Sequence, residues 1–396
     1  MARDSSDTPT PSSLSRDLSP SALAAGFITV LVGFASTGVL VFQAARAAGA
    51  GPDEVASWIW ALGVGCGLTS FGLSLRYRQP VVTAWSSAGS ALLAATSGLT
   101  LGEASGAFVA CGLLLLLSGV TGWFERALSR IPAALAAGML AGVLLRFGMD
   151  VFVAMSASFW LVAVMFAAYL AGRRRWPRYA VLGVLAAGVA VAAAQGTLHL
   201  GGVSLQPAVP VWTTPAFTWD AVIGVGVPLF VVTMASQNVP GVATLRASGY
   251  DAPISPLISW TGAATVALAP FGAFAINLAA ITAAICMGRE AHEDSRRRYV
   301  AAMAAGVFYL LVGIFGATLG ALLAAFPREL VLALAGLALL NTIGGGLAVA
   351  LRDDDWREPA LITFLVTASG ATLFGIGSAF WGLVAGGLAT VVLRRV

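Results

Sequence analysis

Apolar stretches about twenty residues long follow one another along almost the whole of this 396-residue chain. A helix needs about 20 apolar residues to cross the hydrocarbon core of a bilayer, and charged, proline-rich or turn-forming residues bound these stretches. Only 10% of the residues are charged, against roughly 25% in soluble domains, so a water-soluble fold cannot cover this much apolar surface. The pattern predicts an all-α integral membrane protein.

The apolar stretches divide into fourteen predicted transmembrane segments. The first seven are 22–45, 55–75, 80–100, 104–124, 133–150, 154–172 and 179–198. A polar, proline-rich connection at 201–220 precedes the other seven, which are 219–239, 254–270, 271–288, 299–325, 329–351, 358–375 and 376–393. No charge separates segments 9 and 10 or segments 13 and 14, so a count of twelve remains open.

The basic residues favour one side of the membrane. Short cytoplasmic loops of membrane proteins carry an excess of basic residues. If the N-terminus is cytoplasmic and every segment crosses, all of the 22 basic residues, which are arginines, lie on the cytoplasmic side except Arg46, Arg146 and Arg328. The sequence therefore predicts a multi-pass protein of the bacterial inner membrane with both termini in the cytoplasm. Residues 1–20, which are polar and rich in Pro and Ser, are predicted to be a disordered cytoplasmic tail.

Several other function classes lack the residues that they need. The arginines are not clustered on a polar face, so nucleic acid is not a predicted partner. The three cysteines lie singly in apolar stretches, and His199 and His292 lie in opposite loops without HxxxH or HExxH spacing. We therefore predict no metal, no cofactor and no enzyme activity. No P-loop is present for ATP-driven transport.

Corresponding features recur at a nearly constant spacing in the two groups of segments. The groups start at 22 and 219, their fifth segments start at 133 and 329, and their last segments end at 198 and 393. Because seven is odd, the second group enters the membrane from the opposite side, which makes the repeat inverted. Inverted repeats are typical of transporters that alternate between two openings.

Segments 3 and 10 are each predicted to be a short strand followed by a half-helix. Each opens with proline and a run that suits extended backbone, 80–85 and 270–275, and residues that favour helix N-caps follow. The spacing of the prolines aligns Ser87 with Asn277. In an inverted repeat the N-termini of the half-helices face each other, and their N–H groups attract an anion without a basic side chain. Ser86, Ser87 and Asn277 are therefore candidate substrate-binding residues, unless they only cap kinked helices.

Segment 8 carries a second polar cluster, beside Pro240 and Gly241. Gln237 and Asn238 cost free energy in hydrocarbon unless they are hydrogen-bonded, so we predict that they contact substrate at an interrupted helix end or hold a neighbouring helix. Weaker candidates for the substrate site, for which helix packing is the alternative, are Ser36, Thr37, Gln43, Trp85 and Phe274.

Segment 5 contains a possible intramembrane ion pair. Arg146 and Asp150 lie four residues apart, on one helical face, near the predicted outer end of the segment. Their pair is interpreted either as a gate or as a structural contact. The repeat spacing aligns Asn341 with Arg146, so this depth is predicted to be polar in both halves.

Four stretches carry a pattern known from a transporter family. They are FASTGVLVFQAA (34–45), PLFVVTMASQNVPGV (228–242), FGAFAINLAAITAAICMGRE (271–290) and LALLNTIGGGL (337–347). In these stretches the chain resembles the benzoate/proton symporters of the BenE family, which are similar in turn to nucleobase transporters and sulphate-type anion exchangers. That resemblance implies fourteen segments in two inverted repeats, arranged as a core domain and a gate domain that often forms a homodimer. The implied core domain is 21–130 with 219–326, and the implied gate domain is 131–200 with 327–396.

One departure from the nucleobase relatives bears on the substrate. Those relatives have carboxylates in segments 8 and 10 that contact substrate and couple protons, whereas this chain has Gln237 and Asn277 near the matching positions. An amide can donate hydrogen bonds to a substrate carboxylate that an acid would repel. The proton then travels either on the substrate or on Glu290, at the inner end of segment 10.

These features predict a secondary transporter that imports benzoate or a related aromatic carboxylate with protons by alternating access. A nucleobase or inorganic-anion transporter of the same fold is the alternative, ahead of a channel or a membrane-embedded enzyme. The predicted partners are the carboxylate, protons and membrane lipid.

Overall fold

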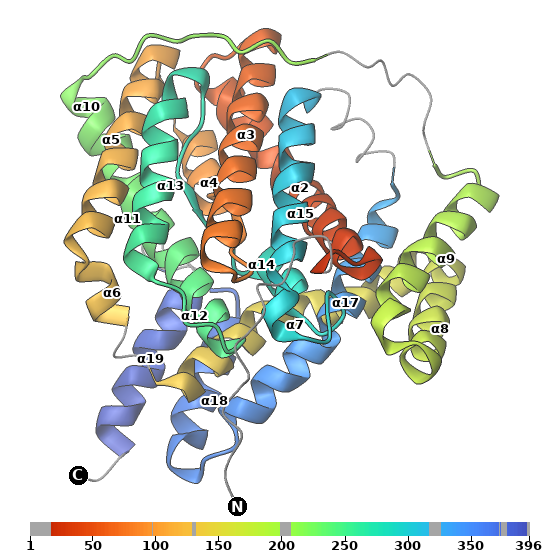
Figure 1. Cartoon of the computed structure of the whole chain (residues 1–396). Helices are drawn as coiled ribbons and strands as arrows, with labels where there is room; N and C mark the ends of the chain where they lie inside the picture. Colours follow the sequence, from red (N-terminus) through yellow and green to blue (C-terminus); the bar gives the residue numbers. More distant parts are fainter. Residues whose placement is uncertain are drawn as a thin grey trace, which may run out of the picture.

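The protein is mostly helical in its computed structural model (Figure 1). The structure describes residues 17–96, 98–128, 132–198, 207–316, 326–371, 373 and 378–393. Within these ranges, seven helices are long and apolar enough to cross a membrane. This confirms the prediction of a mostly helical membrane protein. They are Pro52–Tyr77, Leu101–Thr121, Ala133–Ala157, Trp219–Ala247, Ile254–Phe271, Ser295–Ile314 and Arg328–Ala350. The end of the predicted segment 299–325 and most of the predicted tail lie outside the described residues.

The elements follow one another in the order of the predicted segments, and several of their bounds differ from the predicted ones. In the first half they are α2 (Pro20–Ala47), α3 (Pro52–Tyr77), β1 (Thr83–Trp85), α4 (Ser87–Ala95), α5 (Leu101–Thr121), α6 (Trp123–Leu128), α7 (Ala133–Ala157), α8 (Phe159–Arg175), η1 (Pro177–Tyr179) and α9 (Ala180–Ala194). In the second half they are α10 (Trp219–Ala221), η2 (Val222–Gly226), α11 (Val227–Thr233), η3 (Met234–Asn238), α12 (Val239–Ala247), α13 (Ile254–Leu268), η4 (Ala269–Phe271), β2 (Ile276–Leu278), α14 (Ile281–Met287), η5 (Ser295–Arg297), α15 (Tyr299–Ile314), α17 (Arg328–Ala350), α18 (Asp354–Ala368) and α19 (Ser378–Leu393).

The helices form two bundles, and each bundle draws on both halves of the chain (Figure 1). In the larger bundle, made of α2–α6 and α10–α15, α3 packs against α15 and α5 against α13. In the smaller bundle, made of α7–α9 and α17–α19, α7 packs against both α17 and α18. Small residues allow this close approach, since a Cβ at Gly63 of α3 would lie only 2.5 Å from the Cα of Gly313 in α15.

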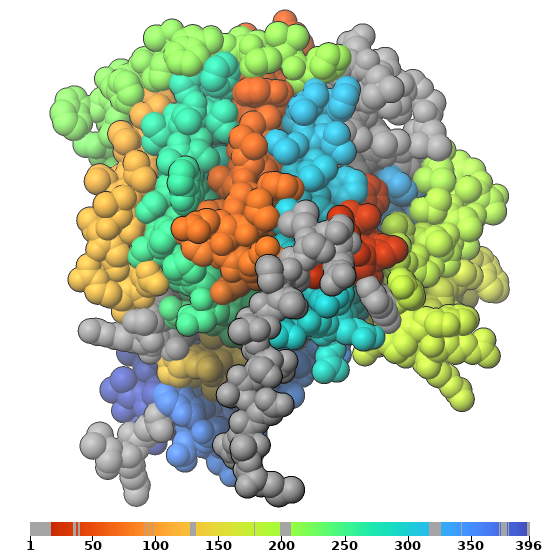
Figure 2. All heavy atoms as spheres, in the orientation of Figure 1, coloured from red at the N-terminus to blue at the C-terminus, as the bar shows by residue number. Residues whose placement is uncertain are grey.

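The chain between the two halves closes one end of the larger bundle. Residues 207–218 run across that end, which is uppermost in Figures 1 and 2. Backbone N–H groups of Ala208, Thr213 and Ala216 donate to carbonyl oxygens of Ile314, Pro270 and Gly102 at 2.7–2.8 Å. The connection is therefore attached to three elements of the larger bundle.

The two strands pair antiparallel inside the larger bundle, with Thr83 opposite Leu278, Ala84 opposite Asn277 and Trp85 opposite Ile276. A two-stranded sheet has two unpaired edges, and side chains from neighbouring helices satisfy groups on both. The N–H of Thr83 donates to the Ser70 hydroxyl of α3 at 2.9 Å. On the other edge, the Ile276 N–H donates to Thr265 at 3.0 Å and the Leu278 N–H to the side-chain oxygen of Asn238 at 2.9 Å.

Segments 3 and 10 each consist of a short strand and a short helix, as predicted, but the predicted register between them is wrong. Ser86 caps α4, since its hydroxyl accepts from the Gly89 N–H at 3.0 Å. Asn277 caps no helix, because it lies within β2 and α14 begins only at Ile281. The additional residues before β2 form η4 and a turn at Gly272, so the strand starts later after Pro270 than β1 does after Pro80.

Three further boundaries differ from the sequence predictions. The helix at 219–247 is not interrupted at Pro240 and continues to Ala247. Its irregular backbone is confined to two π-helical turns, η2 and η3, within the helix. Helix α7 extends seven residues beyond the predicted end at 150, because neither Gly nor Pro stops it before Ser158. The predicted end of the disordered tail, at residue 20, is too late in the chain, because Asp17 is buried and forms an ion pair with Arg297 at 3.4 Å.

Gly272 provides a test of the turn that precedes β2. Its φ is 99°, and a Cβ there would overlap the Trp58 ring, whereas Gly196 has a φ of 68° and no atom within 4 Å of a Cβ. Gly196→Ala should bear only the left-handed backbone cost of about 1–2 kcal/mol. We expect Gly272→Ala to lower the thermal denaturation midpoint in detergent clearly more than Gly196→Ala does. Equal shifts would show that Trp58 makes room at no cost.

Candidate functional site

A cavity of about 750 Å³ lies between the two bundles. This volume is within the range of small-molecule sites, roughly 300–1,000 Å³. The larger bundle contributes residues of α2, β1, α4, α14 and α15, of the segment around η3 and of the two residues before α14. The smaller bundle contributes residues of α7, α18 and α19. Polar side chains on its wall include Thr37, Ser87, Thr96, Ser236, Gln237, Thr282 and Thr367. None of the described residues that line it is acidic.

The N-terminal end of α4 is fixed at the cavity wall against the last residue of α11 and against η3. The Thr233 hydroxyl donates to the Ser86 hydroxyl, and the Gln237 amide donates to the Ser87 hydroxyl, both at 3.0 Å. Ser86 is fully buried, whereas Ser87 and Gln237 line the cavity. The structure therefore brings together the two polar clusters that the sequence placed in separate segments.

Asn238 and Asn277 lie behind the cavity wall rather than on it. Both are fully buried, and neither lines the cavity. The side-chain oxygen of Asn238 accepts from Leu278 in β2, and the amide of Asn277 donates to the Ala275 carbonyl at 2.9 Å. The side-chain oxygen of Asn277 is buried without a hydrogen-bond partner among the described residues. In this structure the two amide side chains form hydrogen bonds with backbone groups and do not face the cavity.

The aromatic candidates separate into one wall residue and one packing residue. Trp85 lines the cavity, and its indole N–H donates to the Thr37 hydroxyl at 3.1 Å. Tyr309 of α15 also lines it and packs edge-on against Trp85, with ring centroids 6.0 Å apart. Phe274 is fully buried against the rings of Trp58 and Phe108 and does not line the cavity.

The segment 1 candidates also have different positions. Thr37 is half-buried on the cavity wall, whereas Gln43 is exposed and does not line the cavity. Ser36 belongs to α2, but its side chain lies outside the described part of the structure. Of the two whose side chains the structure describes, Thr37 is positioned to meet a molecule in the cavity and Gln43 is not.

The predicted ion pair of segment 5 does not form. Among the residues that the structure describes, no salt bridge joins Arg146 to Asp150. Arg146 lines the cavity, whereas Asp150 and Asn341 do not, so the guanidinium and the carboxylate are directed differently. Because α7 runs to Ala157, Arg146 lies near the middle of this 25-residue helix rather than near its end. The expectation that the site lacks a basic side chain is wrong.

Sequence reasoning missed Tyr309 and Thr367. The side-chain oxygens of both are buried without a hydrogen-bond partner in the described structure, and both residues line the cavity. Tyr309 is an isolated polar group within the apolar helix α15, and that isolation was the available signal. Thr367 lies in α18 together with Thr363 and several charged residues, so its polarity did not single it out. Neither segment carries an irregular pattern that would have drawn attention to it.

Glu290 lies outside the cavity, between the two bundles. It follows α14 of the larger bundle, and its carboxylate pairs with Arg173 of α8 in the smaller bundle at 3.1 Å. Its other oxygen is buried without a hydrogen-bond partner among the described residues. Burial raises the pKa of Glu290, while its own backbone N–H and the nearby Arg173, Arg298 and Arg289 act in the opposite direction. Within the described residues, no group of three or more His, Cys, Asp and Glu could hold a metal ion.

The chain matches a known transporter family over nearly its whole length. The sequence model of BenE, described as "Benzoate membrane transport protein", matches residues 16–392. The chain belongs to the BenE family. Its relatives include "Inner membrane protein YdcO" of Escherichia coli, 48% identical over 95% of this chain and 97% of that protein. The "Benzoate membrane transport protein" of Acinetobacter baylyi is 41% identical over 96% of this chain and 97% of that protein. This BenE chain is thus a member of a transport family and not an enzyme.

The fold is also similar to that of a solved structure. The solved structure described as "The overall structure of SLC26A9" superimposes with a TM-score of 0.51 at 14% sequence identity. The match covers 94% of this BenE chain and 64% of the other. At this identity the likeness concerns the fold alone.

Asn238 offers a test of how β2 is held. Asn238→Ala removes the acceptor of the Leu278 N–H and leaves a buried donor unpaired, which costs about 1–3 kcal/mol. We expect the denaturation midpoint of the purified variant to fall, with Gln43→Ala, at an exposed position outside the cavity, remaining close to wild type. An unchanged midpoint for Asn238→Ala would mean that this hydrogen bond contributes nothing to stability.

Proposed function

We propose that this BenE protein imports benzoate or a related aromatic carboxylate together with protons, by alternating access across the bacterial inner membrane. The observation that carries the proposal is the cavity between the bundles, whose described wall has hydroxyl, amide and aromatic groups and no acid. A carboxylate ligand needs donors, and its ring needs apolar and aromatic contacts. The name of the Acinetobacter baylyi relative and its 41% identity support benzoate as the substrate.

The carboxylate is proposed to bind near the N-terminal end of α4. This nine-residue helix has N–H groups without intrahelical partners in its first turn, and its dipole favours an anion there. Ser87 and Gln237 lie at the same point of the cavity wall and supply further donors. Trp85 would contact the aromatic ring from the adjoining strand. Ser86, Asn238 and Asn277 are proposed to position these groups from behind the wall.

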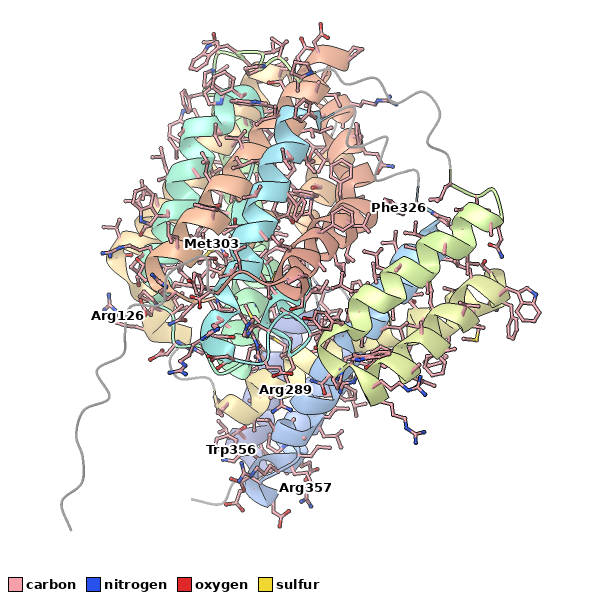
Figure 3. All side chains as sticks on the ribbon, turned by 45° about the vertical axis from the view of Figure 1, so that its right-hand side comes forward. Arg126, Arg289, Met303, Phe326, Trp356 and Arg357 are labelled. Atoms are coloured by element: carbon pink, nitrogen blue, oxygen red, sulfur yellow. The ribbon has the colours of Figure 1, made fainter. Side chains whose placement is uncertain are left out.

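Alternating access is proposed to occur by movement of the larger bundle, as core domain, against the smaller bundle, as gate domain. The cavity lies between the bundles, so their relative movement would change its opening. Figure 3 shows Arg289 and Arg357 in the lower part of the molecule. We propose that this end faces the cytoplasm, as the distribution of arginines in the sequence predicts for both termini. Phe152, Phe159 and Trp160 are exposed on the smaller bundle and are proposed to face lipid or the partner copy of a homodimer.

Proton-driven uptake of benzoate tests the function directly. In proteoliposomes, labelled benzoate should accumulate under an inward proton gradient and saturate with concentration. Gln237→Ala should raise the KM about tenfold, because one charge-assisted hydrogen bond to the carboxylate is lost. Uptake of uracil or sulphate without benzoate would favour the alternative transporters of the same fold. Flux that is independent of the gradient and does not saturate would indicate a channel.

Glu290 is one of two proposed proton carriers, the other being the substrate itself. The charged and titratable groups around it are Arg173 and Tyr169 of α8, Arg289 beside it and Arg298 before α15. Because burial raises its pKa, Glu290 takes up a proton at a higher pH than an ordinary carboxylate, and protonation removes its attraction for Arg173. Loss of this contact between the bundles at low pH would favour their separation at that point.

The pH dependence of uptake separates the two carriers. Glu290→Gln imitates the protonated form at every pH, so benzoate uptake by this variant should no longer rise as the outer pH is lowered from about 8 to about 5. Glu293→Gln, which changes an exposed neighbour, should behave as wild type. Proton-coupled uptake that is unchanged in Glu290→Gln would discard Glu290 and assign the proton to the substrate.

A further inference from the structure

Arg146 is the one residue with a permanent charge among the described residues that line the cavity. It occupies the middle of α7, and Gly142, Val143 and Phe147 of the same helix face also line the cavity. Its side chain is exposed, which in this position means open to the cavity. Guanidinium groups stay protonated at every physiological pH, so this positive charge cannot be removed by titration.

No described residue compensates this charge. Arg146 donates no hydrogen bond to a described residue and forms no ion pair with a described carboxylate, although Asp150 lies one turn away. Beyond the described ranges the sequence has acidic side chains only at Asp4 and Asp7. An ionisable side chain within a membrane is costly unless it is paired or performs a function. A guanidinium that no described residue compensates, in a cavity whose described lining has no acid, is therefore suited to bind an anion that enters from outside.

The two walls of the cavity differ in what they offer such an anion. Both bundles supply hydroxyl groups, but among the described lining residues the charge comes from the smaller bundle, through Arg146, and the larger bundle supplies only neutral groups such as Ser87 and Gln237. An anion that contacts both walls would connect the two bundles. A neutral ligand of the same shape would contact the same rings but gain nothing from the charge.

We propose that Arg146 is the carboxylate-binding residue that makes the cavity selective for anions, and that it holds the substrate from the side of the smaller bundle. This inference rests on the proposed function for the identity of the substrate. That the ligand is an anion is inferred from the cavity itself. The planar guanidinium can donate two parallel hydrogen bonds to one carboxylate, and lysine can replace its charge but not this geometry. The prediction of a gating residue at this position thus becomes a prediction of a residue that selects the ligand.

Binding of a charged ligand and of its neutral counterpart distinguishes this role from a structural one. In purified protein, Arg146→Gln should weaken benzoate binding about 10- to 100-fold, while binding of benzamide, which has the same ring and no charge, should change less than about threefold. Arg146→Lys should retain an intermediate affinity for benzoate. The matched control is Arg328→Gln, at an exposed arginine that begins α17 and does not line the cavity; it should bind both ligands as wild type does.

The remaining outcomes separate this inference from the proposed function. Wild-type affinity of Arg146→Gln for benzoate would overturn the role of Arg146. Equal weakening of benzoate and benzamide binding, in Arg146→Gln and in Arg146→Lys alike, would also overturn it, because the effect would then not depend on the charge of the ligand. If wild type binds sulphate instead of benzoate and Arg146→Gln loses that binding, the anion site stands and the benzoate assignment fails. If wild type binds no anion at all, both are wrong.

Discussion

The pairing of β1 with β2 is the interaction on which the rest of this structure depends. Lipid offers no hydrogen bonds, so extended backbone is tolerated within a membrane protein only where other protein groups satisfy it. The two three-residue strands pair with each other through their backbones. On the outer edges, side-chain oxygens of Ser70, Thr265 and Asn238 accept hydrogen bonds from backbone N–H groups of the strands. Because the strands end inside the larger bundle, α4 and α14 can begin there and present their first residues to a cavity.

This arrangement explains why polar residues occur in two layers around the cavity. Asn238 and Asn277 are fully buried because β2 needs partners for its backbone, whereas Ser87 and Gln237 reach the wall because α4 begins beside η3. Consecutive residues of a helix do not share a face. Gln237 and Asn238 are therefore adjacent in sequence and yet serve opposite sides of the wall.

Sequence patterns predicted the type and order of the elements, and they indicated some of the residues that line the candidate site. Apolar length and proline positions predicted the helices and the strand-and-helix form of segments 3 and 10, because both depend on local backbone preferences. The polar cluster at Gln237 and the cap at Ser86 were found because polar groups in apolar segments need partners. The alignment of Ser87 with Asn277 was wrong, because spacing from proline takes no account of the turn at Gly272. Tyr309 and Thr367 were missed because their exposure to the cavity depends on helices distant in sequence.

The sequence by itself determined that the chain is a helical membrane protein, the extent of its apolar helices and its membership of the BenE family, because these follow from composition, local pattern and motif. Only the tertiary structure decided which side chains share one cavity. Arg146 illustrates the difference: the four-residue spacing to Asp150 suggested an ion pair within one helix, but α7 packs so that the guanidinium lines the space between the bundles. The direction of a side chain is set by the helices packed around it, and that packing involves residues from both halves of the chain.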